Sequence, residues 1–262
     1  MSLEAKPLEL LRRDQMELAR AFWIVGIGFI CFVAAGRPGD GLPRWGTLPE
    51  THPTDMVIFA GLYWGSMLLN ALAPALVLLG LNRLRRLRRE YRDAMVVTGV
   101  LQVMLVGQLL GFLPRPEPFN EWPLSPFTWG LAAAAIAALL AMLWLISVGT
   151  ARLARSLSLE GVPRSAYLAS GLLTAGVAVP FAFFALLLFL RTVLPAARST
   201  QLQLSAAEIA KMAGSAAMLI LTLLAVGGFF LFLSALDAAY RAVKSAEPQQ
   251  IQALLTRTAP GE

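Results

Sequence analysis

Six long stretches of this 262-residue chain contain no Asp, Glu, Lys, Arg or His. They are Ala21–Gly36, Met56–Asn82, Ala94–Leu113, Phe127–Gly149, Ala166–Leu190 and Met212–Leu236. Roughly 20 helical residues cross a hydrocarbon core, and only helices and closed barrels satisfy every backbone group there. Barrel strands would alternate polar and apolar residues, which these stretches do not. The sequence therefore predicts an all-α membrane protein, a polytopic bundle of six transmembrane helices.

Composition supports this class and narrows the partners. Only 15% of the residues are charged, whereas soluble domains carry about 25%. The net charge of +6 lies in short segments between the apolar stretches. Positive charge placed there orients a membrane protein and attracts anionic headgroups, so we expect no nucleic-acid partner. The predicted partners are membrane lipids, with anionic headgroups at the inner face, and other membrane subunits or copies of this chain.

The distribution of basic residues predicts the orientation. Sixteen of the 22 Lys and Arg residues lie in the N-terminal segment, the second and fourth connections and the C-terminal segment, and six lie in the other three connections. Basic residues accumulate on the cytoplasmic side of membrane proteins. We therefore expect both termini in the cytoplasm, and the protein in the cytoplasmic (inner) membrane of a bacterium.

Three regions are expected along the chain. Residues 1–20 have apolar positions at helical spacing and predict an amphipathic helix at the cytoplasmic interface, or alternatively an extension of the first span. Residues 21–244 form the six-helix transmembrane domain, and residues 245–262 a cytoplasmic tail. Ser205 and Glu208 have capping-box spacing, which predicts a long last helix from about residue 206 to about 244.

Reactive groups are scarce. His52 is the single histidine and Cys31 the single cysteine, and no acid lies inside a span. Serine–histidine hydrolysis, bis-histidine haem ligation and intramembrane proton relays need more such groups. We predict no catalytic residue, no metal site, no cofactor and no enzymatic activity. Asp237 is expected to pair with Arg241, its i+4 neighbour.

A few polar residues and prolines inside the spans suggest a transport hypothesis. The candidate polar path is lined by Asn70, Thr98, Gln102 and Thr174. Interior prolines in the second and fifth spans, Pro74 and Pro180, are candidate helix breaks. Paired broken helices in two inverted halves mark the substrate site of many transporters. The alternative is that these polar groups only make hydrogen bonds between helices. Small residues such as Gly171 predict close helix approach.

Two further regions are candidates for interaction. A cytoplasmic basic hairpin contains Arg83, Arg85, Arg86, Arg88, Arg89 and Arg92. Leu84, Leu87 and Tyr91 fall on one face of this segment. The hairpin is predicted to orient the chain and contact headgroups, or to dock an acidic partner. The proline-rich outer loops form caps or docking surfaces, with anchors at Trp45, Phe119 and Trp122.

These observations favour a non-catalytic integral membrane subunit of an oligomer or larger assembly, and first of all a permease or pore-forming element. Six spans with both ends inside resemble the permease halves of some ATP-driven exporters, a likeness of topology alone. The alternative is a structural or accessory subunit that packs on a large membrane complex and has no transport path of its own. That alternative predicts a solid bundle with an apolar flank.

Overall fold

The computed structural model describes residues 8–34, 53–109, 126–193 and 203–257. Within these ranges the chain is entirely helical apart from short turns, as the sequence predicts. The helices are α1 (Leu8–Ala34), α2 (Pro53–Leu84), α3 (Arg89–Leu109), α4 (Pro126–Ser156), α5 (Val162–Val193), α6 (Gln203–Ser245) and α7 (Pro248–Arg257).

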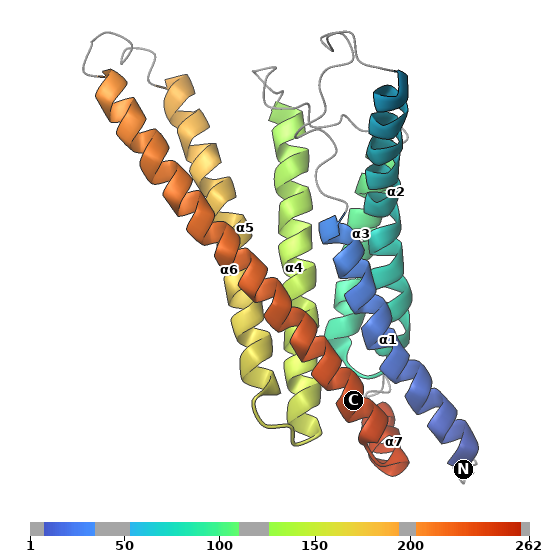
Figure 1. Ribbon diagram of the computed structural model, residues 1–262. Coiled ribbons are helices and arrows are strands. Elements are labelled where there is room, and N and C mark those ends of the chain that lie inside the picture. Colours follow the sequence, from blue (N-terminus) through green and yellow to red (C-terminus); the bar gives the residue numbers. More distant parts are fainter. Residues whose placement is uncertain (1–7, 35–52, 110–125, 194–202, 258–262) are drawn as a thin grey trace.

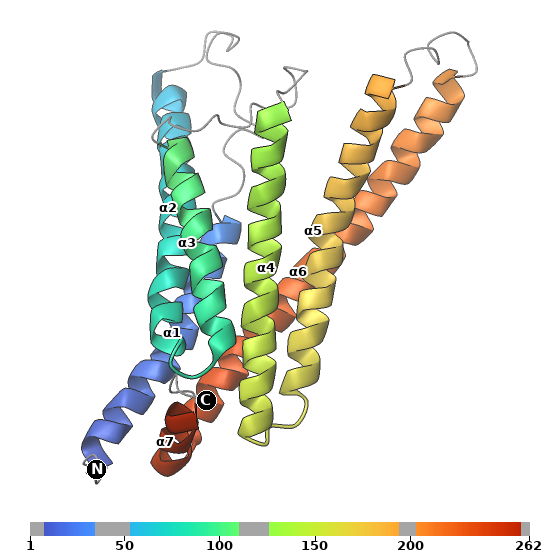
Figure 2. The same cartoon turned by 180° about the vertical axis from the view of Figure 1, so that it is seen from behind.

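Consecutive helices from α1 to α6 run up and down and pack against their neighbours (Figure 1). Helix α1 also packs against α6, which closes the order of helices into a ring, and α7 lies against α1. The turns 85–88 and 157–161, the start of α1 and helix α7 all lie at one end of the bundle (Figures 1 and 2). We call it the basic end, because most of the Lys and Arg residues lie there, and we call the other one the opposite end.

Three described helices contain a stretch long and apolar enough to cross a membrane. These stretches are Glu9–Ala34 in α1, Ala133–Ser156 in α4 and Leu219–Ser245 in α6. Many large apolar side chains are exposed on the helix surfaces, among them Leu72, Val103 and Phe230. Such surfaces are costly in water and cost nothing against lipid. The fold is therefore consistent with a helical protein embedded in a membrane.

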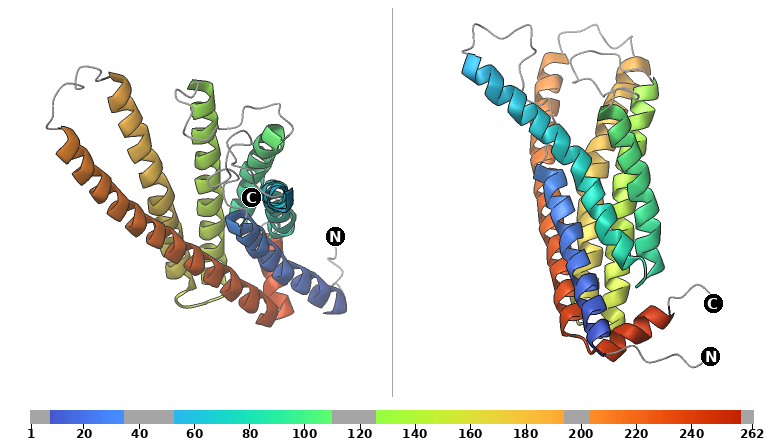
Figure 3. Two further views of the ribbon diagram at one scale, coloured as in Figure 1. Left: turned by 45° about the horizontal axis from the view of Figure 1, so that its top comes forward. Right: turned by 90° about the vertical axis from the view of Figure 1, so that its right-hand side faces the viewer.

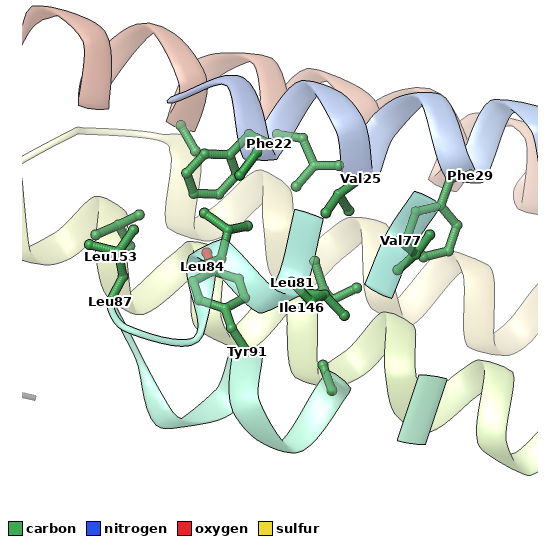
Figure 4. Close-up of a cluster of buried hydrophobic side chains, with 14 of the residues drawn as sticks. Phe22, Val25, Phe29, Val77, Leu81, Leu84, Leu87, Tyr91, Ile146 and Leu153 are labelled. Carbon is green, nitrogen blue, oxygen red and sulfur yellow. The ribbon is translucent and has the colours of Figure 1, made fainter. Parts of the chain in front are cut away.

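Among the described side chains, the core lies toward the basic end. Phe22 of α1, Leu84 of α2, Tyr91 of α3, Leu153 of α4 and Val243 of α6 are all buried there in one continuous cluster (Figure 4). Toward the opposite end, α5 and α6 diverge from α4 (Figures 1 and 3). The bundle is thus packed at one end and spread at the other.

Reciprocal glycines bring α1 and α2 into close contact. A Cβ atom built on Gly28 of α1 would lie 2.7 Å from a methyl carbon of Val77 in α2. A Cβ atom built on Gly80 of α2 would lie 2.5 Å from a methyl carbon of Val25 in α1. Each helix therefore offers a glycine to a valine of the other, and only a residue without a side chain fits at either position.

Helices α5 and α6 meet in the same manner. A Cβ on Gly176 would lie 2.6 Å from the Cβ of Ala225, and one on Gly228 would lie 2.9 Å from the Cβ of Leu172. The expectation of close approach at Gly171 is wrong, because a Cβ there meets nothing within 4 Å. The contact face of α5 passes through Gly176 and Leu172, and Gly171 lies on another face.

The first and last described segments, α1 and α7, are helical and contact each other. Residues 8–34 form the single helix α1, so the boundary expected at residue 20 falls inside a continuous helix. Helix α7 occupies much of the expected tail. The Glu247 carbonyl accepts the first bond of α7 from the Gln250 amide at 2.9 Å, and Pro248 takes the first helical position, where its missing N–H is not needed.

Candidate functional site

The turn between α2 and α3 is anchored on α4. Arg88 Nη2 donates to the carbonyl oxygen of Arg152 at 3.3 Å, and the Arg152 guanidinium forms an ion pair with Glu90. The Glu90 side chain is only 13% exposed, whereas that of Arg152 is 57% exposed. Part of the predicted basic hairpin therefore stabilises the bundle, because Arg88 and Glu90 link the α2–α3 turn to the last turns of α4.

Tyr91 completes this connection from inside. Its hydroxyl lies 3.1 Å from Oγ1 of Thr150 in α4, and its ring meets the Phe22 ring edge-on at a centroid distance of 6.0 Å. Burial raises the pKa of the Tyr91 phenol above its ordinary value, so the group stays neutral and can donate a hydrogen bond. Leu84 and Leu87 are fully buried beside it, although the turn 85–88 separates Leu84 from α3 (Figure 4).

Other hairpin arginines face outward. Arg83 and Arg85 are exposed, and their side chains make no ion pair or hydrogen bond to any residue the structure describes. Arg89 and Arg92 both approach Asp93, at 3.6 and 3.9 Å. Unpaired guanidiniums bind carboxylates and phosphates well. The outer surface of this turn can therefore attract anions, while its inner surface holds the bundle together.

Gln15 joins the two ends of the chain, a contact that sequence reasoning missed. Its Nε2 donates to the carbonyl oxygens of Val243 at 2.7 Å, Lys244 at 3.2 Å and Ala246 at 2.8 Å. The last carbonyls of a helix lack partners within the helix. Gln15 of α1 therefore caps the end of α6 and fixes the start of α7. The sequence feature that could have indicated this contact is an uncharged Gln among charged neighbours.

The described polar side chains of the candidate path donate to backbone carbonyls. Thr98 Oγ1 donates to the Ala94 carbonyl, and Thr174 Oγ1 donates to the Ser170 carbonyl, each at 2.7 Å within its own helix. Thr98 and Gln102 lie on α3, whereas Thr174 is exposed on α5, and α4 lies between these helices (Figure 2). The side chain of Asn70 lies outside the described part of the structure.

The two candidate helix breaks do not end their helices. Helix α2 continues through Pro74, and α5 continues through Pro180, whose side chain lies outside the described part. A proline within a helix leaves a carbonyl of the preceding turn without its amide partner. In that turn of α2, Gln102 Nε2 donates to the Ala71 carbonyl at 3.0 Å. The carbonyl that loses its amide partner is that of Asn70, four residues before Pro74, and Gln102 binds the adjacent carbonyl, so a neighbouring helix supports α2 next to its missing bond.

Four of the remaining candidates from the sequence lie outside the described residues: Trp45, Phe119, Trp122 and His52. The local ion pair is confirmed: Arg241 Nη2 lies 2.7 Å from a carboxylate oxygen of Asp237.

Two kinds of surface are available on the described residues. Among them, no group of three or more His, Cys, Asp or Glu side chains gathers as metal ligands would. They offer exposed guanidiniums at the basic end and apolar helix faces along the bundle. No family model matches this chain, and no curated protein or solved structure matches it at a significant level.

Proposed function

We propose that this chain is a non-catalytic integral membrane subunit that crosses the bilayer six times. Three apolar stretches of sufficient length support this proposal, and α2 and α5, at 32 residues each, exceed the roughly 20 residues that a span requires. Both described chain ends and both basic turns lie at one end of the bundle. By the positive-inside rule, that end faces the cytoplasm of the inner membrane and both termini lie inside.

We further propose that the subunit acts by packing within an oligomer or a larger assembly, without a transport path of its own. One observation carries this choice. Each described side chain of the candidate path, Thr98, Gln102 and Thr174, donates to a backbone carbonyl. Side chains that line a path need groups free to contact a solute or water. Here the donors bind helix carbonyls, and Gln102 Oε1, which has no hydrogen-bond partner among the described residues, is itself buried, as expected in a structural subunit.

A permease or pore-forming element is the second candidate, and the shape of the bundle favours it. Helices α5 and α6 diverge from α4 toward the opposite end, while α1 packs against α6 (Figures 1 and 3). A bundle closed at one end and spread at the other suits a subunit that completes a passage with further copies or partners. In that arrangement the path lies between subunits.

Anionic lipids are the proposed partners at the basic end. The Arg83 and Arg85 side chains are exposed and have no hydrogen-bond or ion-pair partner among the described residues, and both basic turns lie at this end of the bundle. Each Lys or Arg held near an anionic leaflet contributes about 1 kcal/mol. The basic end is therefore proposed to fix the depth of the protein relative to the inner headgroups.

The first test is purification of the full-length chain in mild detergent, with native mass measurement and identification of every co-purifying protein. A homo-oligomer or a stoichiometric complex is expected. A monomer that retains no partner across several mild detergents would contradict the assembly.

The second test separates the two candidates. The purified protein is reconstituted into vesicles, and leakage of ions and small dyes is measured. Vesicles that stay tight support the structural role. A leak supports the pore-forming element, and Thr174→Val would then alter it if the exposed face of α5 lines the passage.

A further inference from the structure

We propose that one anionic phospholipid binds along the outward face of α5, where its phosphate contacts Arg155 and Arg164 and an acyl chain lies over Gly171. This inference rests on the proposed function in one respect, because it requires that the basic end lie at a leaflet with anionic lipids. The inference adds one defined lipid site to the general attraction of the basic end for anionic lipids.

The site begins with a groove on α5. Its volume is about 390 Å³, and it is lined by Arg164, Tyr167, Leu168, Gly171 and Leu172. These residues recur at helical spacing, so the groove follows one face of α5 for roughly 12 Å at 1.5 Å per residue. Polar atoms of the lining side chains occur only at its start, on Arg164 and Tyr167. An apolar channel with a cationic mouth matches the division of a phospholipid into tail and phosphate.

No contact between helices of the protein explains why a glycine lies at the floor of the groove. Gly171 is exposed, and a Cβ built on it would meet nothing within 4 Å. Gly176 and Gly228 contrast with it, because a Cβ on either would collide with the facing helix. Those two glycines are explained by the contact between α5 and α6. Gly171 instead leaves a hollow on the lipid-facing surface, which an acyl chain can fill.

A tight turn places a second cation beside the mouth of the groove. The Leu159 amide donates to the Ala154 carbonyl at 2.9 Å, and Ser158 adopts a left-handed φ of 55°, so α4 ends in a compact cap. The chain then reverses into α5. As a result, the Arg155 guanidinium of α4 lies 5.6 Å from the centre of the Tyr167 ring on α5.

Neither cation is neutralised within the protein. Arg155 and Arg164 are exposed, and neither side chain forms an ion pair or hydrogen bond with another described residue. Glu160, the acid of the intervening turn, is exposed and pairs with neither. The Arg155 guanidinium therefore lies over the Tyr167 ring from α4, and Arg164 lines the same groove from α5.

This combination identifies the ligand as a lipid phosphate. Guanidinium groups bind phosphate through paired hydrogen bonds, and tyrosine rings concentrate at the membrane interface. Basic sites between helices on the cytoplasmic side bind anionic headgroups. An apolar partner helix could occupy the groove, but it would leave both cations without a counter-charge. An anionic phospholipid satisfies the cations and the groove together.

The test is native mass spectrometry of the full-length protein in detergent, titrated separately with phosphatidylglycerol and with phosphatidylcholine. The wild-type protein is expected to bind one phosphatidylglycerol before any phosphatidylcholine. The variant Arg155→Gln/Arg164→Gln should lose that preference by about fivefold for each arginine removed. Gly171→Leu fills the groove and should abolish the first lipid adduct, with Gly171→Ala intermediate. Arg89→Gln/Arg241→Gln removes the same charge at two arginines that are already paired with Asp93 and Asp237, and it should keep the preference.

Three outcomes would overturn the site. The control variant could lose the preference as much as the groove variant, which would indicate a diffuse charge effect. Gly171→Leu could retain the adduct, or it could convert an oligomer to monomers, which would identify the groove as a protein interface. Thermal unfolding of each variant verifies that it is folded. Because the titration is done in detergent, it depends on neither orientation nor partners, so the proposed function and this site can fail separately.

Discussion

The basic end and the opposite end of this bundle are held by different means. At the basic end, side chains from several helices form one buried cluster, and Gln15 and Tyr91 add hydrogen bonds between helices. Toward the opposite end, α5 and α6 move away from α4, and apolar side chains such as Leu219, which is 62% exposed, face outward (Figure 3).

The difference follows from the solvent. In hydrocarbon, an apolar side chain gains almost nothing by leaving lipid for protein, so helices need not pack along their whole length. Close fit, interhelical hydrogen bonds and burial near the polar interface must then hold the bundle together. The described contacts of these kinds are concentrated toward the basic end, and the stability of the fold is expected to depend on them.

The largest expected effect compares two phenylalanines two residues apart on α6. Phe232 is 1% exposed and its ring lies 4.9 Å from that of Phe29, whereas Phe230 is 65% exposed. Phe232→Ala should lower the free energy of unfolding by about 3–5 kcal/mol, because it leaves a cavity in the core. Phe230→Ala should change it by less than about 0.5 kcal/mol. Unfolding in mild detergent measures both, and equal losses would contradict a core at the basic end.

The second prediction concerns the close contact of α1 and α2. A side chain at Gly80 would meet Val25 and, at 2.8 Å, the Ala21 carbonyl oxygen. Gly80→Val should therefore force the helices apart and destabilise the protein by about 1–3 kcal/mol. Gly99→Val is the matched control, since a Cβ there meets nothing within 4 Å. The same unfolding measurement applies, and a Gly80 variant as stable as the Gly99 variant would disprove the close approach.

The third prediction tests the connection between the chain ends. Gln15→Leu removes the donor for three carbonyls at the end of α6 and should cost about 1–3 kcal/mol. Hydrogen exchange of residues 243–257 should rise, because α7 loses its fixed start. Gln250→Leu, on the exposed face of α7, should leave exchange unchanged. Protection that survives in the Gln15 variant would show that α7 is held by its apolar contacts alone.

The smallest effect concerns Tyr91. Tyr91→Phe removes the hydrogen bond to Thr150 and should cost about 1 kcal/mol at neutral pH. The pKa of the folded-state phenol is raised above its ordinary value of about 10, so the stability it contributes is present below that pH and is lost as the pH rises further. The wild-type protein should therefore lose stability above about pH 10 more steeply than Tyr91→Phe.

Melting curves between pH 8 and pH 11 test this difference. Tyr240→Phe is the control, because Tyr240 is only partly buried. If wild type and Tyr91→Phe respond to alkaline pH in parallel, then Tyr91 does not ionise on unfolding as the argument requires.

Local features were predictable from the sequence. The absence of charge located the long helices, and the i+4 spacing of Asp237 and Arg241 predicted their ion pair. The capping pattern predicted a long sixth helix close to the observed Gln203–Ser245. Each of these depends on residues within one helix or on the cost of placing a charge in lipid. None of these three features requires knowledge of how the helices are rotated.

Contacts between helices were not predictable in this way. The Gly28–Val77 and Gly80–Val25 contacts depend on which faces α1 and α2 turn toward each other. A helix that is apolar all round carries no polar face to reveal its rotation, and α2 is of this kind. The Gln15 cap and the Glu90–Arg152 pair likewise join positions far apart in the chain.

The most direct test of the central claim is the side from which the basic end can be labelled. Arg85→Cys and Gln249→Cys are introduced separately in a Cys31→Ser background, since both positions are exposed at that end. A membrane-impermeant thiol reagent is applied to sealed vesicles of known orientation. Labelling of both cysteines from the cytoplasmic face is predicted. Labelling from opposite faces, or of both from the outer face, would contradict the proposed six-span orientation.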